Sequence, residues 1–290
     1  MTDLAAPLKV APGREVSLGR DFDPGYTGQV HRAQADALLA DTVQLLADYQ
    51  DRLSAQDTYG VLMVLQGIDA AGKDSTVKHV MSGVNPQGVE VRAFKQPSAE
   101  ELNHDFLWRY QQALPGRGRI GIFNRSHYEE VLVVRVHREL LAAEKMPAVG
   151  EGNVWDRRYR EINDWERYLV DNGIRVVKIM LNLSRQEQAR RFVKRIKHPE
   201  KNWKFSPNDV KERHYWDDYQ RAFEAMLSRT STKWAPWHVV PADHKWFGRL
   251  ATAAILVTAL QAIDPRYPAP DPAVADQMAL AKAELTAELG

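Results

Sequence analysis

The sequence predicts an α/β fold, in which a parallel central sheet is covered by helices on both faces. Three observations predict it. Short apolar runs alternate with longer segments of helical periodicity along most of the chain. A glycine-punctuated turn follows a strongly apolar run, in the arrangement of a phosphate-binding P-loop. The 290 residues show no break in composition that would require a second large domain.

In the first half of the chain, strands and helices alternate around the P-loop. Residues 1–29 contain Pro and Gly without a period and are expected to form an N-terminal arm. Residues 30–56 have apolar side chains at helical spacing and predict a long helix. The buried strand 61–65 then leads into the P-loop and its helix. The elements expected next are a strand at 89–94, a helix at 98–113 and a strand at 119–123.

The second half continues the alternation and adds a basic helical insertion. Aromatic and aliphatic residues at helical spacing over 155–169 predict a helix, and we interpret this stripe as core packing. The further elements expected are a strand at 175–181, a helical lid at about 190–215, a strand at 237–240, a helix at about 244–263 and a proline-rich tail at 266–290. Residues 30–265 would thus form one P-loop domain between arm and tail.

The turn after the apolar run 61–65 carries the P-loop pattern. Gly67 is followed, after four residues, by Gly72 and Lys73, which open a predicted helix. The backbone N–H groups of such a turn converge on phosphate, and the lysine and the helix N-terminus add positive charge there. The alternative is a glycine-rich turn with a surface lysine. The phosphate-binding set expected from this turn is Gly67, Ala70, Ala71, Gly72, Lys73, Asp74 and Ser75.

Two acidic residues distinguish this loop from most P-loops. Asp74 follows Lys73, where a Ser or Thr usually supplies a hydroxyl to Mg²⁺, so the metal must be held differently. Asp69 lies inside the loop, where a carboxylate would repel phosphate unless a metal or a proton intervenes. We therefore expect Asp69 to coordinate Mg²⁺ or to orient the attacking oxygen. The alternative is that Asp69 only hydrogen-bonds its own backbone in the turn.

A second chemical segment follows the predicted strand 119–123. In P-loop enzymes the strand beside the P-loop strand usually ends in an acidic residue that holds Mg²⁺, whereas this strand ends in Asn124. An amide oxygen can bind a cation but cannot balance its charge. Arg125 can bind phosphate oxygens bidentately, and Glu129, one helical turn further on, can orient Arg125 or face the metal. The alternative is an exposed Arg/Glu helical pair.

A third segment, residues 190–204, is strongly basic in an otherwise nearly neutral chain. Seven of its fifteen residues are Lys or Arg. Arg191, Lys194 and Arg195 fall at three- and four-residue spacing, so we expect one helical face directed at an anion. Pro199 interrupts the helix, as in a mobile flap that closes over a site. A solvated face or a nucleic-acid patch is the alternative.

The composition limits the function classes. Lys and Arg number 39 against 38 Asp and Glu, so affinity for phosphate must come from local clusters. The absence of cysteine excludes disulfides and thiolate metal sites and suits a reducing compartment. We find no signal-peptide pattern and no apolar run near the roughly 20 residues that span a bilayer. We therefore expect a cytoplasmic protein without membrane contact.

Taken together, these segments resemble the family-2 polyphosphate kinases over residues 20–265. The matching motifs are GIDAAGKDST, FNRSHYEEVLVVRVH, RRFVKRIKHPEKNWKFS, ERHYWDDYQRAFEAM and TSTKWAPWHVVPADHKWF. The resemblance implies a three-layer, thymidylate-kinase-like P-loop kinase fold with a parallel central sheet and a helical lid. Many members carry DRSWYNR where this chain has NRSHYEE from Asn124 on. This version resembles the class III subgroup, which uses both AMP and ADP.

The resemblance also implies roles for particular residues. Inorganic polyphosphate would phosphorylate nucleoside mono- and diphosphates with Mg²⁺ as cofactor. The implied catalytic residues are Asp69, Lys73 and Arg125, with Asp69 as the metal ligand. The polyphosphate-binding set would extend to Lys78, Arg191, Lys194 and Arg195. The implied nucleotide-binding residues are Lys95, Arg109, Asn124, Arg125 and Glu129. We expect adenine nucleotides, with guanine nucleotides as an alternative, no nucleic acid, and a homo-oligomer, either a dimer or a tetramer.

Two other function classes are compatible with the residue spacing alone. An ATP-dependent nucleotide or small-molecule kinase on the same fold would use ATP in place of polyphosphate as donor. A non-catalytic P-loop protein would bind polyanions tightly and in a salt-sensitive way but without turnover. This second class leaves Asp69 without a purpose.

Overall fold

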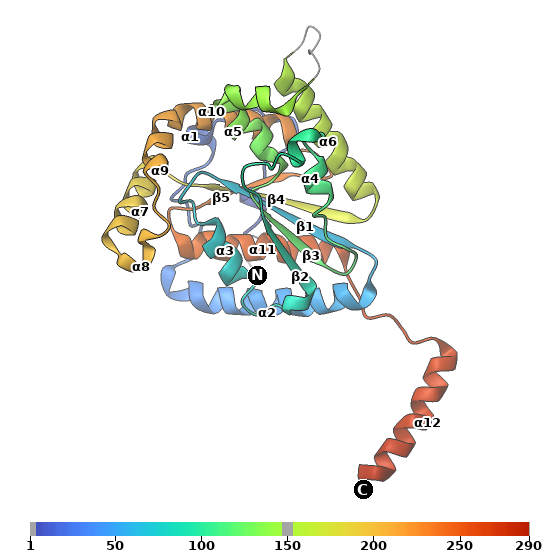
Figure 1. The fold of residues 1–290 in the computed structure, drawn as a ribbon. Coiled ribbons are helices and arrows are strands. Elements are labelled where there is room, and N and C mark those ends of the chain that lie inside the picture. The colour runs from blue at the N-terminus through green and yellow to red at the C-terminus, as the bar shows by residue number, and fades with distance from the viewer. Residues whose placement is uncertain (1–3, 147–152, 290) are drawn as a thin grey trace.

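The structure is a computed structural model that describes residues 4–146 and 153–289. Within those residues one parallel sheet has the strand order β2-β3-β1-β4-β5 (Figure 1). The strands are β1 (Gly60–Gly67), β2 (Val89–Ala93), β3 (Ile120–Asn124), β4 (Ile174–Asn182) and β5 (Trp237–Pro241). All five predicted strands are confirmed, and so is the predicted α/β class.

The strand order places the P-loop in the middle of one sheet edge. The central strand β1 pairs with β3 on one side and with β4 on the other. Leu65 lies opposite Asn124, and Gly67 lies opposite Leu181. The carboxyl ends of these parallel strands therefore meet at the same edge, where open α/β sheets bind their ligands.

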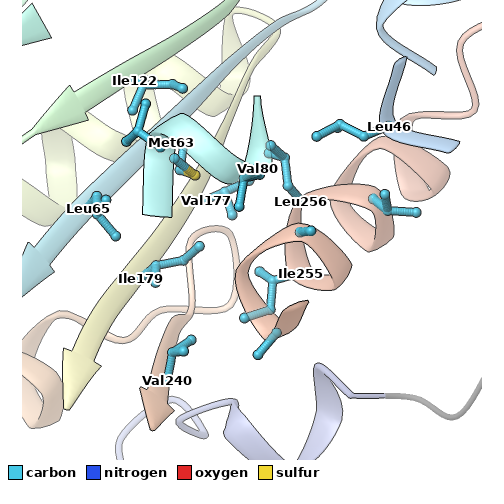
Figure 2. Packing of buried hydrophobic residues seen from close by; sticks show 14 of the residues in the cluster. Leu46, Met63, Leu65, Val80, Ile122, Val177, Ile179, Val240, Ile255 and Leu256 are labelled. Atoms are coloured by element: carbon cyan, nitrogen blue, oxygen red, sulfur yellow. The ribbon is translucent and has the colours of Figure 1, made fainter. Parts of the chain in front are cut away.

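Three helices cover the first face of the sheet: α2 (Arg32–Gln56), α3 (Lys73–Val80) and α11 (Lys245–Ile263). Figure 2 shows the buried contact layer, in which Met63 and Leu65 of β1 and Val177 of β4 lie near Val80 of α3 and Leu256 of α11. Odd-numbered residues of β1 point to this face because side chains alternate along a strand.

The opposite face is covered by α5 (Val133–Val136), α6 (Val154–Asp171) and α10 (Trp216–Thr230) (Figure 1). The even-numbered Leu62 and Val64 of β1 belong to this second core. Trp155, Tyr159 and Ile162 of α6 are buried in it, which confirms the interpretation of their stripe as core packing. The sheet is thus buried on both faces, as its continuous apolar runs predict.

The basic region between β4 and α10 folds as a group of helices beside the P-loop. These are α7 (Arg185–Lys197), α8 (Pro199–Asn202) and α9 (Pro207–Glu212), followed by the 3-10 turn η6 (Arg213–Tyr215). Pro199 and Pro207 each stand in the first turn of a short helix, where the missing proline N–H costs nothing. The expected interruption of the basic helix at Pro199 is therefore confirmed.

The predicted helix at 98–113 is wrong. The segment contains only the 3-10 turn η3 (Glu101–Asn103) and the single turn α4 (Trp108–Gln111). Asp105 accepts a hydrogen bond from the N–H of Leu107 at 2.9 Å, and the ring of His104 stacks on Trp108 at 4.1 Å. Side-chain bonds to nearby backbone compete with a continuous helix, and they do so here.

Helix α11 corrects the expectation that no apolar run approaches membrane-spanning length. Its 19 residues have a mean hydropathy of 1.4, which meets the length and composition of a spanning helix. However, 67% of that stretch is buried inside the protein, against α2 and the sheet. We therefore interpret it as the core helix of the α/β domain.

The described parts of the arm and the tail differ from each other. The arm has two short turns, η1 (Ala6–Leu8) and α1 (Leu18–Asp21), and Val10 donates its N–H to Trp237 of β5 at 2.9 Å. The tail carries the exposed helix α12 (Pro272–Leu289), which projects from the domain in Figure 1. Residues 1–3 and 290 of the predicted arm and tail lie outside the described residues.

Candidate active site

The P-loop follows β1, and its backbone surrounds the side chain of Lys73. Gly72 is the N-cap residue of α3 and has a φ of 109°, a backbone region that residues with side chains rarely adopt. Lys73 donates from Nζ to the carbonyl of Gly67 at 2.6 Å and is 9% exposed. Burial, followed by the charge of Arg125, lowers the pKa of Lys73 to about 8. The loop therefore holds a largely buried ammonium at the edge of a cavity, where a phosphate could bind.

Arg125 stands at the end of β3 in a strained backbone conformation, with a φ of 65°. Its guanidinium donates to Asp69 at 2.6 Å and to Glu129 at 3.0 Å. Glu129, together with Asp69, raises the pKa of Arg125 despite its burial. The structure places Glu129 beside Arg125, within reach to orient it, and joins Asp69 to the same pair. The P-loop and the β3 segment are thus one constellation.

Asn124 faces the P-loop helix. Its Nδ2 donates to Oδ1 of Asp74 at 2.8 Å. That hydrogen bond is the main cause of the lowered pKa of Asp74, and Lys204 and Lys73 lower it further. The two positions where this chain departs from common P-loop enzymes, Asn124 and Asp74, therefore compensate each other. An Asp at 124 would place two carboxylates at hydrogen-bond distance.

A cavity of about 520 Å³, the P-loop cavity, opens above this constellation. Its cationic lining residues are Lys73, Lys95, Arg125, Arg191, Lys194, Arg195, Lys201, Lys204 and Lys245. The carboxylates that line it are Asp69 and Asp74. This excess of positive charge in a concave site concentrates polyanions. The charge comes from the P-loop, the segments that follow β2 and β3, the lid and the start of α11, as the near-neutral total composition requires.

Arg191 is placed differently from its neighbours on α7. It is 6% exposed, and its Nη1 donates to the carbonyls of Ala70 at 3.0 Å and Ala71 at 2.8 Å. Its Nη2 donates to Asp243 at 3.2 Å, and its Nε to Glu187 at 3.0 Å. Arg191 therefore ties the first part of α7 to the P-loop and to the loop before α11. It is not a free charge on a lid.

Arg195, one turn further along α7, reaches the second lid helix. Its guanidinium lies 3.3 Å from the carboxylate of Asp209 in α9. Burial, and then the charge of Asp69, raises the pKa of Asp209. Arg195 and Lys194 both line the P-loop cavity, as expected of lid cations. Lys78, by contrast, is exposed on α3 and is not among the residues that line this cavity.

A larger cavity of about 1070 Å³ adjoins the first one. The two share Phe94, Lys95 and Arg125 in their linings. Arg109 lines the larger cavity, donates to the carbonyl of Lys95 at 2.8 Å and lies over the ring of Phe94. The structure therefore brings the predicted residues Lys95 and Arg109 together at the junction with Arg125.

The larger cavity also contains a charged pair that the sequence reasoning missed. Glu130 accepts from Arg158 of α6 at 3.4 Å, and burial raises the pKa of Glu130 to about 7. Arg158 is 1% exposed and lies within the apolar stripe of α6. The signal in the sequence was an arginine at a position that the helical spacing predicts to be buried, since a buried charge needs a charged or polar partner.

A fully buried network supports the segment after Arg125. Lys178 of β4 donates to Glu166 of α6 at 2.6 Å and to the hydroxyl oxygen of Tyr128 at 2.9 Å. Tyr128 donates to the same carboxylate at 2.7 Å. Nearby, Ser126 accepts a hydrogen bond from Gln66 of β1 at 3.1 Å. These hydrogen bonds hold in place the residues that directly follow Arg125 in the chain.

The candidate metal ligand Asp69 is not part of a preformed cluster of metal-ligating side chains among the described residues. Among residues 4–146 and 153–289, no group of three or more His, Asp or Glu side chains is arranged to hold a metal ion. Mg²⁺ often takes only one or two protein carboxylates and fills its shell with phosphate oxygens and water. Asp69 and Asp74, both lining the P-loop cavity, fit a metal that arrives together with phosphate.

The chain is similar to known proteins over most of its length. The family model described as "Polyphosphate kinase 2 (PPK2)" matches residues 29–268. An ADP-polyphosphate phosphotransferase of Rhodopseudomonas palustris is 47% identical over 272 residues, which cover 92% of this chain and 93% of that protein. An AMP/ADP-polyphosphate phosphotransferase of Meiothermus ruber is 42% identical over 267 residues, 91% of this chain and 96% of that one. The crystal structure of polyphosphate kinase 2 from Arthrobacter aurescens TC1 superposes with a TM-score of 0.86 at 40% identity and covers 95% of each chain.

Proposed function

Since the chain belongs to the polyphosphate kinase 2 family and is thus a polyphosphate-dependent nucleotide phosphotransferase, we propose that its acceptors are AMP and ADP. The observation that carries the proposal is the pair of joined cavities, which meet at Arg125. One cavity contains the P-loop and most of the cations, and suits a polyphosphate chain. The other suits a nucleotide. A phosphoryl group would pass between them at their junction.

The larger cavity has the volume and lining of a nucleotide site. Ligand pockets measure roughly 300–1,000 Å³ and combine apolar walls with a few polar groups. Here Phe94, Phe106 and Leu107 provide apolar surface, and Arg109 and Arg125 lie at the end nearest the P-loop. An acceptor with its base in this cavity would direct its phosphates toward Arg125, whose planar guanidinium suits bidentate phosphate binding.

The donor side would use the P-loop and the lid. Lys73 and the loop N–H groups would hold the transferring phosphate and its neighbour, while Lys194 and Arg195 would cover the chain from α7. A phosphate acceptor is already ionised near neutral pH, so no strong general base is needed. Positioning and charge neutralisation would lower the barrier.

We also propose that Asp69 and Asp74 hold Mg²⁺ when phosphates are bound. The metal would neutralise charge on the phosphate oxygens. Arg125 now occupies one oxygen of Asp69, so the ion pair between them must rearrange or share the carboxylate. Glu129 remains on the other side of Arg125 and can keep that guanidinium oriented meanwhile.

The proposal is tested by incubating the protein with polyphosphate, Mg²⁺ and each of AMP, ADP, GMP and GDP, and separating the nucleotide products over time. We expect ADP and then ATP from AMP, and ATP from ADP. Formation of ADP without any ATP under excess polyphosphate would contradict the use of both acceptors. Parallel reactions with ATP replacing polyphosphate test the ATP-dependent alternative, and Lys73→Ala serves as the inactive control.

A further inference from the structure

The start of helix α7 lies against the backbone of the P-loop. Ser184 caps this helix by accepting a hydrogen bond from the N–H of Glu187 at 3.1 Å, which fixes where the first turn begins. Gln188, the fourth residue of α7, is 2% exposed and donates from Nε2 to the carbonyl of Asp69 at 2.9 Å. A buried side chain of the lid region thus binds the backbone of the proposed metal ligand.

The side-chain amide of Gln188 has a defined orientation. Arg213, the first residue of η6, donates from Nη1 to Oε1 of Gln188 at 2.6 Å and to the carbonyl of Arg185 at 3.2 Å. A guanidinium has only donors, so the oxygen of the amide must face Arg213 and its nitrogen must face Asp69. Gln188 therefore connects the end of the lid region, at η6, with the P-loop.

The contact holds one end of a strained turn. Ala70 has a φ of 65°, a conformation that a residue with a side chain keeps only where its surroundings enforce it. The carbonyls of three successive residues at this turn accept hydrogen bonds from α7: that of Asp69 from Gln188, and those of Ala70 and Ala71 from Arg191. Without Gln188 the turn would be free to relax at Asp69, while Arg191 would still hold the rest of the loop.

The carboxylate of Asp69 is subject to two opposing charges. Arg125 attracts it and lies 2.6 Å away. Asp209 of α9 lines the same small cavity of about 30 Å³ as Asp69 and Gln188, and the charge of Asp69 contributes to the raised pKa of Asp209, so the two carboxylates repel each other. These charges act on the side chain of Asp69, whereas Gln188 holds the backbone from which that side chain projects.

We propose that Gln188 is a positioning residue for phosphoryl transfer: held by Arg213, it keeps the backbone of Asp69 in the orientation in which the carboxylate can take a metal ion that arrives with phosphate. This inference rests on the proposed function, since it uses the metal role given there to Asp69. Replacing a residue that orients a metal ligand typically lowers metal affinity or activity about 10- to 100-fold. Gln188 acts in this way, through the ligand and without touching the substrate.

The test measures binding of tripolyphosphate by isothermal titration calorimetry, in excess Mg²⁺ and in EDTA, for the wild type, Gln188→Met and Asp69→Asn. The ratio of the two dissociation constants reports how far the protein uses the metal, because contacts to phosphate alone enter both. Asp69→Asn gives the ratio of a protein without the ligand carboxylate. We expect Gln188→Met to shift the ratio about tenfold from the wild-type value toward that of Asp69→Asn, and to alter the dissociation constant in EDTA less than about twofold.

Two further variants separate positioning from loss of structure. Arg213→Met frees the amide oxygen of Gln188 and should shift the ratio in the same direction by a smaller factor. Because Arg213 is only partly buried, this variant tests the inference even where a change at Gln188 impairs folding. Gln186→Met, at an exposed glutamine of the same helix, is the matched control and should keep the wild-type ratio and kcat.

The possible outcomes are distinct. Equal weakening in Mg²⁺ and in EDTA would make Gln188 a structural support only, and an unchanged ratio in both Gln188→Met and Arg213→Met would likewise overturn the inference. An Asp69→Asn ratio equal to that of the wild type would overturn the metal role of Asp69 and the inference with it. A wild-type protein that phosphorylates neither AMP nor ADP would instead refute the proposed function, whatever the binding ratios.

Discussion

The low pKa of Lys73 predicts how donor use depends on pH. Burial brings this pKa to about 8 from an ordinary value of 10.5. The free enzyme therefore loses the ammonium as the pH rises through 8, and with it the positive charge that the P-loop offers to polyphosphate. The value of kcat/KM reports groups of the free enzyme. We expect it to fall about tenfold between pH 7 and pH 9, and to approach a tenfold loss per pH unit above that.

The same shift has a consequence for stability, with a definite sign. Between pH 8 and 10.5 the unfolded chain keeps a proton on Lys73 that the folded chain has lost, so stability rises with pH in this window. Below pH 8 the buried charge costs up to about 3 kcal/mol, from 2.5 pKa units at 1.36 kcal/mol each. Bound polyphosphate would stabilise the ammonium and raise its pKa again. The basic limb of kcat should therefore lie at higher pH than that of kcat/KM.

The assay measures both parameters from pH 6.5 to 9.5 for the wild type and for Lys73→Arg. Arginine stays charged throughout, so any limb that remains in this variant belongs to the substrates or the metal. The difference between the two profiles isolates Lys73. A wild-type kcat/KM that stays flat to pH 9.5, or an identical basic limb in both proteins, would refute the reasoning.

Three further predictions concern the constellation around the P-loop. Lys73→Ala and Asp69→Ala should each lower kcat at least about a hundredfold without loss of the folded structure in circular dichroism, because both act on transition-state charge; near-normal turnover in both would remove this site from consideration. Arg195→Ala should raise the KM for polyphosphate and reduce its salt sensitivity, and an unchanged salt slope would leave Arg195 as a solvated charge. Asn124→Asp should shift the preference between AMP and ADP, because it places a second carboxylate beside that of Asp74, where Asn124 now donates a hydrogen bond at 2.8 Å. The ratio of the nucleotide products measures this preference, and an unaltered ratio would contradict the prediction.

Much of the fold could be predicted because strands that are buried on both faces consist of consecutive apolar residues, which are easily recognised in the sequence. Strands such as β1 and β4 are continuous apolar runs, and their bounds differ from the predicted ones by few residues. The segment 98–113 could not be predicted in the same way. Its helical pattern competes with bonds made by Asp105 to nearby backbone, and the outcome depends on contacts such as that of Asn103 with Lys145.

The candidate site shows a similar division. Residues in motifs, such as Asp69 and Arg125, meet because strand ends converge at one edge of a parallel sheet. Lys245 lines the same cavity, and although it lies in the motif TSTKWAPWHVVPADHKWF, no periodicity connects it with the lid. Its position follows only from where α11 starts beside the P-loop helix. Sequence patterns predict which face a residue occupies, and not what lies opposite that face.

Arg191 shows why the hydrogen bonds that a cationic side chain already makes must be known before the side chain is assigned to a ligand. Helical spacing places it with Lys194 and Arg195, and charge alone does not separate the three. The hydrogen bonds of Arg191 do separate it, because its guanidinium is engaged by the carbonyls of Ala70, Ala71 and Asp243 and by Glu187. Removing it would leave buried carbonyls without donors and loosen the loop that binds phosphate. A double change of Arg191 and Arg195 would therefore mix damage to the P-loop with loss of a lid contact, and only the change at Arg195 measures the lid charge.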